Sequence, residues 1–218
     1  MQPHLADIGL AYGLSGGEPS GPNAGSAVRF VAIASRWPLA SAARAAVPAP
    51  ELVVCALVEA ASGPVEVIGV HIPTIARGRL TKVETEEGLG RRLQLPAAMP
   101  RVVCGDFNAP KAELADGTVV PFASKRDERA HAAEVAVLGS AARLGLVDAF
   151  RAIHGYDAIA HSWWWKNRGR TGGYRLDHIL ASRDLEPHEC YYRDDLREAG
   201  LSDHAPLFAR FRDGRESV

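Results

Sequence analysis

The sequence lacks the features that would assign it to several large classes of protein. No run of apolar residues reaches the roughly 18 needed for a membrane-spanning helix. The first residues, MQPHLADIGLAYGL, lack the basic start and the apolar core of a signal peptide. A formal net charge of −1 over 218 residues gives no overall positive field, so any polyanion binding would need a local basic patch. We therefore expect a cytoplasmic protein without membrane association.

Cysteine is also scarce. The three cysteines, Cys55, Cys104 and Cys190, are odd in number, far apart and without CxxC spacing. Two of them, Cys55 and Cys104, lie within apolar runs that have the composition of strands. We predict reduced, buried cysteines, as expected in a cytosolic protein.

The composition that remains is that of an ordinary globular chain, with 47% hydrophobic and 23% charged residues. The length suffices for one large domain, predicted over residues 1–218 with a core at about 27–212, because no repeat or linker divides the chain. Periodicity and turn residues predict strands at 27–35, 51–60, 65–72, 101–108, 174–182 and 206–211, the second and third forming a hairpin. They predict a helix at 128–146, partly helical structure at 76–100, and surface segments at 13–25 and 109–127. This mixture indicates a layered α/β domain.

Four short stretches place polar residues at the ends of apolar strands. They are VHIP (70–73), GDFN (105–108), RLDHIL (175–180) and LSDHAP (201–206). Each alone is weak, because a histidine or aspartate at a strand end is more often a hydrogen-bonded structural residue than a catalyst. Four in one chain of this size favour a shared polar site.

The stretch GDFNAP shows how such a site can be built. Asp106 and Asn108 are two residues apart, so on an extended chain they point to one face while Phe107 points to the other. Phe107 can then anchor in the core while its neighbours reach into a cleft. Gly-Asp and Asn-Ala-Pro are also common in turns, so this pattern alone leaves a purely structural role open.

In their order and spacing, GDFN, RLDHILAS and LSDHAP resemble the endonuclease/exonuclease/phosphatase superfamily, which includes deoxyribonuclease I and exonuclease III. The segment HSWWWKNRGRTGGYRLDHILAS (161–182) is most similar to the exonuclease III branch. The resemblance implies a deoxyribonuclease I-like α/β (α+β) fold, a two-layer β-sandwich flanked by helices. It also implies a divalent metal, Mg²⁺ or Mn²⁺, and hydrolysis of phosphoesters.

The resemblance also implies a role for each motif residue. Asp203 corresponds to a metal-binding carboxylate, Asp106 to the residue that orients or deprotonates the attacking water, and Asn108 to an amide donor to the phosphate. These residue types suit phosphoester hydrolysis, because its transition state gathers negative charge that a cation and hydrogen-bond donors offset.

Two further motif positions concern histidines. Asp177 and His204 resemble a carboxylate–imidazole pair in which the aspartate fixes the ring and favours the imidazolium. His71 matches the histidine of the deoxyribonuclease and phosphatase branches, whereas the exonuclease III branch more typically has tyrosine there. By contrast, His178 should face away from Asp177 on the same strand, and Asp148 is predicted to be a structural hydrogen-bonding residue.

Candidate substrate-binding residues lie around the tryptophan-rich segment. On a strand, Trp164 faces opposite to its two tryptophan neighbours, so an unpaired base or abasic sugar could pack on it. Arg168 and Arg170 lie in the loop that follows, and Arg175 begins the next strand. A charge cluster is usually a solvated face, but beside aromatic residues it suits contacts with DNA phosphates.

The N-terminal part departs from the family pattern, which begins with an Asn-bearing strand and then a strand ending in Glu. Both belong before the strand predicted at 27–35, and Glu18 lies in a Gly/Pro/Ser-rich loop instead. We predict an N-terminally incomplete chain that binds metal loosely and turns over little, because Mg²⁺ held by few carboxylates keeps most of its waters.

Three functions stay open at this level. The first is a Mg²⁺-dependent nuclease of the exonuclease III type that acts on DNA. The second is a small-molecule phosphatase of the same superfamily, which His71 and the near-neutral charge favour. The third is a non-catalytic remnant or binding module. No protein partner is inferred.

Overall fold

The computed structural model describes residues 2–17, 30–75 and 78–213. The chain divides into two compact units, Met1–Gly105 and Asp106–Val218, and each is described by itself. The single domain expected over residues 1–218 stays a prediction. Within the described ranges, no helix is both long enough and apolar enough to cross a membrane.

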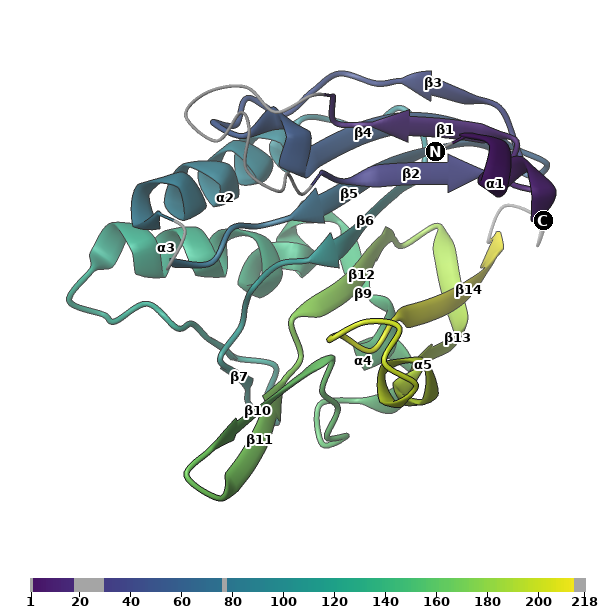
Figure 1. Cartoon of the computed structure of the whole chain (residues 1–218). Helices are drawn as coiled ribbons and strands as arrows, with labels where there is room; N and C mark the ends of the chain where they lie inside the picture. The colour runs from purple at the N-terminus through teal and green to yellow at the C-terminus, as the bar shows by residue number, and fades with distance from the viewer. Residues whose placement is uncertain (1, 18–29, 76–77, 214–218) are drawn as a thin grey trace. The chain divides into compact units, whose positions relative to one another are not determined.

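The described residues of the first unit form strands and the α-helices α1 and α2 (Figure 1). Its elements are α1 (Gln2–Asp7), β1 (Tyr12–Ser15), β2 (Ala32–Ser35), β3 (Leu39–Ser41), a 3₁₀ turn (Pro50–Leu52), β4 (Val53–Ala60), β5 (Gly63–His71), α2 (Arg79–Gln94) and β6 (Arg101–Asp106). The strand order β3-β4-β5-β6 forms its sheet, and β1 pairs with β2. The antiparallel β4–β5 pair, with Val53 opposite Val70, confirms the predicted hairpin.

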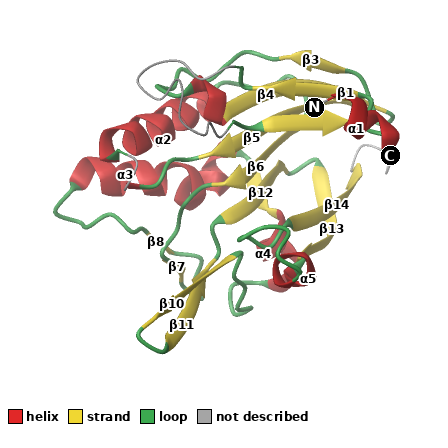
Figure 2. Ribbon diagram, in the orientation of Figure 1, coloured by secondary structure: helices red, strands yellow, loops and turns green. Residues whose placement is uncertain are grey.

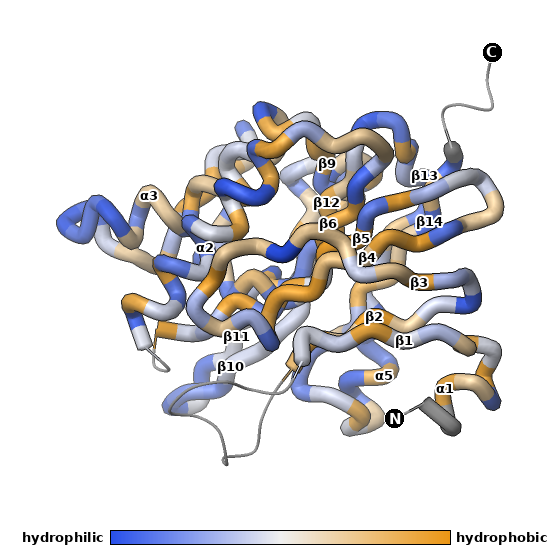
Figure 3. The backbone as a smooth tube through the Cα atoms, turned by 90° about the horizontal axis from the view of Figure 1, so that it is seen from above, coloured by the Kyte–Doolittle hydropathy of each residue, from blue (hydrophilic) through white to orange (hydrophobic). Residues whose placement is uncertain are grey.

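The core of this unit lies on β4 and β5. Val53, Val54, Cys55 and Ala56 are consecutive and all buried, so β4 is covered on both faces. Figure 3 shows hydrophobic residues concentrated along these two strands. The helix α2, predicted within 76–100, is tied to the sheet by a buried ion pair between Arg92 and Glu66 on β5.

Two predictions for the N-terminal part need correction. In the stretch 13–25, predicted as a surface segment without a strand, residues 13–15 belong to the exposed to half-buried strand β1, which pairs antiparallel with β2, and residues 18–25 lie outside the described residues. The strand expected at 27–35 is described as Ala32–Ser35, and residues 27–29 and Glu18 lie outside the described residues. The pattern of β1 is too short to be recognised alone, because its stability comes from pairing with a strand far along the chain.

The described residues of the second unit form antiparallel strand pairs and short helices (Figure 2). Its elements are β7 (Ala112–Glu113), β8 (Val119–Val120), α3 (Glu128–Val137), β9 (Leu146–Asp148), α4 (Ala149–His154), β10 (Trp163–Asn167), β11 (Arg170–Tyr174), β12 (Asp177–Ser182), β13 (Leu185–Tyr192), α5 (Asp194–Glu198) and β14 (Leu207–Asp213). The pairs are β7–β8, β9–β12, β10–β11 and β13–β14. The β10–β11 hairpin projects from the rest of this unit (Figure 2).

Two elements of this unit differ from prediction. The helix expected over 128–146 is α-helical only to Val137 and continues as a 3₁₀ helix over Leu138–Leu144. Gly139 and Ser140 are weak formers of α-helix, which favours the more tightly wound 3₁₀ helix after α3. The expected loop at 109–127 contains the small β7–β8 hairpin, whose turn carries the Asp116-Gly117 pair typical of tight turns.

The three cysteines are free thiols, as predicted. Cys55 and Cys190 are buried, and Cys104 is half-buried. Cys190 on β13 forms an apolar cluster with Ala149 and Phe150 of α4. This cluster fixes α4 on the strand pair that leads into the LSDHAP stretch.

Candidate active site

The turn after β6 joins Asp106 and Asn108, as the alternation within GDFN predicts. The backbone N–H of Asn108 donates to Asp106 Oδ1 at 2.8 Å, and the side-chain amide donates to Oδ2 at 3.1 Å. Phe107, between them, is buried with 3% exposure, whereas its two neighbours are half-buried. The backbone of Asn108 has a φ of 46°, a left-handed conformation that asparagine tolerates better than most residues.

The glycine of the same motif is required by close packing in the first unit. Gly105 has a φ of 135°, which disfavours a side chain. A Cβ at this position would also collide with the backbone carbonyl of Val70 on β5. The glycine therefore allows β6 to approach β5 closely just before the chain reaches Asp106.

His204 and Asp177 form the predicted carboxylate–imidazole pair. Nδ1 of His204 lies 2.7 Å from Asp177 Oδ2, and the two side chains are 23% and 20% exposed. The hydrogen bond with Asp177 raises the pKa of His204; burial opposes this, and the charges of Asp177, Asp106 and Asp203 raise it further. The ring therefore favours the imidazolium form, which can donate from Nε2.

A buried serine holds the two halves of this pair together. The hydroxyl of Ser162, which is 0% exposed, accepts the backbone N–H groups of Leu176 at 2.9 Å and Asp177 at 3.0 Å. The backbone carbonyl of Ser162 accepts the N–H of Ala205 at 2.7 Å, next to His204. This role of Ser162 could not be predicted, because no sequence pattern distinguishes a serine before a run of tryptophans.

Tyr192 is a second residue that sequence reasoning missed. Its hydroxyl donates to the backbone carbonyl of Asp177 at 2.7 Å, and burial raises its pKa, so it stays a donor. The N–H of Phe107 donates to the carbonyl of Leu176 at 2.8 Å, beside Asp177. The backbone at the start of β12 is thus bonded to the segments that carry Asp106 and His204.

Three of these side chains form a group that suits a divalent cation. One potential ligand atom each from Asp106, Asp177 and His204 lies within 4.8 Å of the others. Carboxylate oxygens are the ligands that hard cations prefer, so the chemistry of this donor set fits the metal expected from the sequence. Asp203, the predicted metal ligand, is exposed and lies outside this group, although its charge acts on His204.

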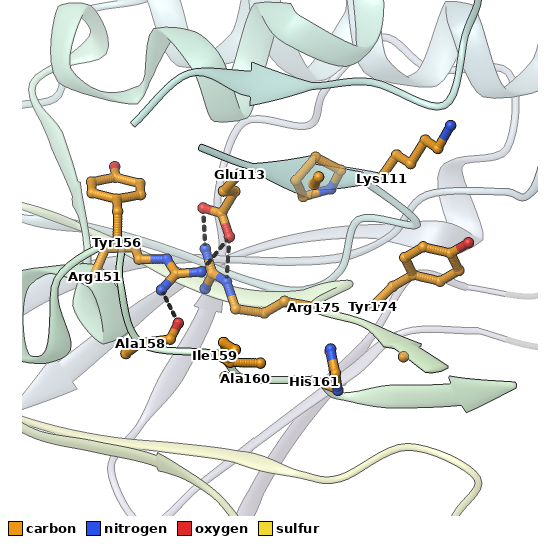
Figure 4. A pocket seen from close by; sticks show the side chains of 13 residues that line it. Lys111, Glu113, Arg151, Tyr156, Ala158, Ile159, Ala160, His161, Tyr174 and Arg175 are labelled. Atoms are coloured by element: carbon orange, nitrogen blue, oxygen red, sulfur yellow. Dashed lines mark hydrogen bonds and ion pairs between the residues drawn. The ribbon is translucent and has the colours of Figure 1, made fainter. Parts of the chain in front are cut away.

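Arg175, predicted to bind substrate, is instead a buried structural residue with 5% exposure. Its Nε and Nη2 donate to Glu113 at 2.7 Å, and Nη2 also donates to Asp148 at 2.8 Å. Figure 4 shows Glu113 facing the guanidinium groups of Arg175 and Arg151. The prediction failed because the carboxylates that occupy this guanidinium come from segments 62 and 27 residues away along the chain.

The same network accounts for two residues predicted to be structural. Asp148 is the N-cap of α4, accepting the N–H of Arg151 at 3.0 Å. His178 is 1% exposed and lies 3.2 Å from Asp148. Burial would raise the pKa of Asp148, but the charge of Arg175 and the hydrogen bond from His178 hold it well below its usual range.

Arg151 completes this network beside a small pocket. Its Nη2 donates to Glu113 at 2.9 Å, and its Nη1 donates to the carbonyl of Ala158 at 2.7 Å. A pocket of about 200 Å³ opens above these ion pairs, with Tyr156 on one side and Tyr174 on the other (Figure 4). The ion-paired residues Glu113, Arg151 and Arg175 are among those that line this pocket.

The tryptophan segment places Trp163, rather than Trp164, next to His204. The backbone of Trp163 forms an isolated antiparallel β-bridge with that of His204. The Trp163 side chain stacks on Tyr174, with ring centroids 6.3 Å apart. Trp164 lies under the guanidinium of Arg197 at 4.0 Å from the ring centroid. Its interaction with an unpaired base therefore stays a prediction.

For the remaining predicted residues, no contact described above links them to the group of Asp106, Asp177 and His204. Arg168 and Arg170 are exposed at the tip of the β10–β11 hairpin. His71 is half-buried at the end of β5, in the first unit. Their roles stay predictions.

Comparison with solved structures supports the predicted fold. An AP endonuclease from Archaeoglobus fulgidus is 26% identical with a TM-score of 0.61, the match covering 83% of this chain and 74% of that one. An endonuclease/exonuclease/phosphatase from Beutenbergia cavernae is 18% identical with a TM-score of 0.65, and the match covers 96% of this chain and 55% of that one. D. rerio TDP2, solved with a single-stranded DNA product, is 14% identical with a TM-score of 0.52, covering 73% and 61%.

These structures share the mixed α/β architecture of sheets flanked by helices, which confirms the predicted fold class. No curated protein sequence matches the chain significantly. The sequence profile of the Endonuclease/Exonuclease/phosphatase family, in contrast, matches residues 3–204. The chain therefore belongs to the Endonuclease/Exonuclease/phosphatase family of metal-dependent phosphoesterases, as its GDFN, RLDHIL and LSDHAP stretches predicted.

Proposed function

We propose that this protein is a Mg²⁺-dependent phosphodiester hydrolase that acts on DNA, as a nuclease of the exonuclease III type. The observation that carries the proposal is the Asp177–His204 pair, bonded at 2.7 Å and grouped with Asp106. Carboxylates and a protonated imidazole together suit an anionic phosphoester whose transition state gains negative charge.

Each side chain has a role in this proposal. His204 donates from Nε2 to a phosphoryl oxygen, and Asp177 fixes the ring from Nδ1 and favours its charged form. Asp106 orients the attacking water and accepts its proton, while Asn108 supplies an amide donor from the turn that it shares with Asp106. Because Ser162 and Tyr192 hold the backbone of Asp177, the pair keeps its geometry without a substrate.

The metal would be held by carboxylates rather than by the ring. A histidine must be neutral to bind a metal, and the raised pKa of His204 works against that. Asp106, Asp177 and the neighbouring Asp203 are therefore the proposed ligands, and hard oxygen ligands favour Mg²⁺. A bound Mg²⁺ would offset charge on the phosphoryl oxygens and lower the pKa of a water.

DNA, and an abasic site in particular, is the substrate favoured by two observations. The AP endonuclease from Archaeoglobus fulgidus is 26% identical over 83% of this chain. The β10–β11 hairpin joins aromatic residues near His204 to exposed Lys166, Arg168 and Arg170, as expected for contacts with unpaired bases and phosphates. A role in DNA repair in the cytoplasm goes with this substrate, and free cysteines suit such a reducing compartment.

A small-molecule phosphatase is the second candidate, which His71 and the net charge of −1 favour. The two candidates differ in what the hairpin does. A nuclease needs the basic hairpin to hold a long polyanion, whereas a phosphatase needs only the carboxylates that hold the metal and the Asp177–His204 pair.

The test is cleavage of a duplex with one abasic site, compared with hydrolysis of a soluble phosphate monoester. We expect slow cleavage of the duplex that rises with Mg²⁺ and disappears in excess EDTA. Asn108→Ala should lower this rate, whereas Asn167→Asp, at the hairpin, should change mainly the affinity. Full activity in excess EDTA would refute the requirement for a metal. Hydrolysis of the monoester without cleavage of the duplex would favour the phosphatase.

A further inference from the structure

His178 contacts the turn that carries Asn108 from the buried side. Its Nε2 lies 2.9 Å from the backbone carbonyl of Ala109, and because a carbonyl only accepts, Nε2 donates this hydrogen bond. Its ring meets Phe107 edge-on, with centroids 5.4 Å apart and planes at 84°. The residues before and after Asn108 therefore both contact the same buried imidazole.

The other side of the ring is fixed away from the site. Nδ1 of His178 faces Asp148 at 3.2 Å, and Asp148 is itself held by Arg175 and by the first turn of α4. The position of the ring is thus set by a buried ion-pair network, whose side chains are at most 11% exposed. Through its hydrogen bond to the Ala109 carbonyl, the held ring restrains the position of the turn.

Strand alternation gives the two residues of the Asp177-His178 pair different tasks. Asp177 faces one side of β12 and bonds His204, while His178 faces the other side and bonds Ala109. We propose that His178 is a positioning residue for Asn108 and, through the two hydrogen bonds of that turn, for the carboxylate of Asp106. The catalytic consequence rests on the proposed function; the structural part does not.

The backbone of Asn108 explains why such an anchor is needed. Its φ of 46° lies in the left-handed region, which a residue with a side chain leaves readily unless its neighbours are held. Asn108 N–H donates to Asp106 Oδ1 only while this conformation lasts. Releasing the Ala109 carbonyl should therefore loosen the turn and let both site residues move.

The first test measures hydrogen exchange of individual backbone amides in a His178→Phe variant. Phenylalanine keeps a ring against Phe107 but cannot donate to Ala109. We expect the Asn108 amide to exchange about tenfold faster or more, the scale for losing one buried hydrogen bond. The Thr118 amide is the internal control, because it makes the same kind of turn with Asp116 at 2.8 Å and has no such histidine.

His154→Phe is the matched control variant. His154 also bonds a backbone carbonyl, that of Cys190 at 2.7 Å, and packs on an aromatic ring, but far along the chain from the turn. It should leave the exchange of Asn108 unchanged. His178→Gln, which can donate to Ala109, should restore part of the protection and replaces His178→Phe if the latter does not fold. Unchanged exchange of Asn108 in both His178 variants would overturn the proposal.

The second test asks whether His178 acts through Asn108. His178→Phe should lower kcat more than it raises KM, because it disturbs groups that act on the transition state. In an Asn108→Ala background the same change should lower kcat less, since the side-chain amide that His178 positions is gone and only the backbone N–H still bonds Asp106. Equal effects in both backgrounds would indicate a general structural role and contradict the proposal. If the wild-type chain hydrolyses no phosphoester, the proposed function fails and the exchange measurement still decides the positioning role.

Discussion

The second unit contains two groups of charged side chains that are built on opposite principles. The ion-pair network consists of Glu113, Asp148, Arg151 and Arg175. Its side chains are at most 11% exposed, and each carboxylate faces a guanidinium. The second group, the metal group, consists of Asp106, Asp177 and His204, of which the two carboxylates are proposed metal ligands and the ring is the proposed donor. The side chains of its Asp177–His204 pair are about one-fifth exposed. In this group carboxylates outnumber cations, and the neighbouring Asp203 adds a further negative charge.

The difference indicates that the network stabilises the fold, whereas the metal group suits the binding of a cation. Buried charges are tolerated only when they have partners, and the ion pairs of this network supply them. An excess of negative charge beside solvent favours the binding of a cation. His178 connects the two groups, because it contacts Asp148 on one side and the turn of Asn108 on the other.

The largest expected effect comes from breaking the network. Arg175→Met keeps the bulk of the side chain but leaves Glu113 and Asp148 short of a buried partner. The free energy of unfolding should fall by about 3–5 kcal/mol, the scale for breaking a buried ion pair. Urea denaturation measures this. Arg193→Met is the control: the Arg193–Asp195 pair is exposed, and a similar loss there would remove the distinction between the groups.

Removing the histidine of the metal group should instead affect the reaction and leave the fold intact. His204→Ala should slow phosphoester hydrolysis about a hundredfold or more, the scale for losing one transition-state donor. Its urea midpoint should stay near that of the wild type. His188→Ala, on exposed chain in β13, is the matched control for both measurements. Near wild-type turnover of His204→Ala would exclude the donor role.

Acid should weaken the network only below the pH range in which ordinary carboxylates are protonated. Burial acts to raise the pKa of Glu113, but the bonds and charges of Arg175 and Arg151 lower it, and the pKa of Asp148 is lowered too. Groups with lowered pKa values stabilise the fold above the pKa of unfolded carboxylates, about 4, and lose this contribution as the pH falls through their folded values. Arg175→Met should therefore unfold at a higher pH during acid titration. Asp195→Asn should leave the midpoint unchanged.

The sequence predicted the parts of the site that depend on local pattern. GDFN and the Asp177-His178 alternation follow from strand geometry, and the structure places Phe107 and His178 in the core as expected. The role of Arg175 could not be predicted, because its partner Glu113 is 62 residues away in a segment expected to be loop. Ser162 and Tyr192 were missed for the same reason, since their partners are backbone groups that only the tertiary fold brings near.

The smallest expected effect concerns the hairpin, which distinguishes a nuclease from a phosphatase. Arg168→Gln together with Arg170→Gln removes two exposed charges from the β10–β11 turn. If both contact DNA phosphates, the slope of log affinity against log salt should fall by about 2, one for each contact, with little change in sequence preference. Binding of a fluorescent abasic duplex at several salt concentrations measures this slope. Arg183→Gln with Arg212→Gln removes the same charge from other exposed positions and should leave the slope nearly unchanged. Equal slopes in the two double variants would show that the hairpin does not follow the phosphate backbone. Substrate capture would then depend on the metal group alone, as the phosphatase candidate requires.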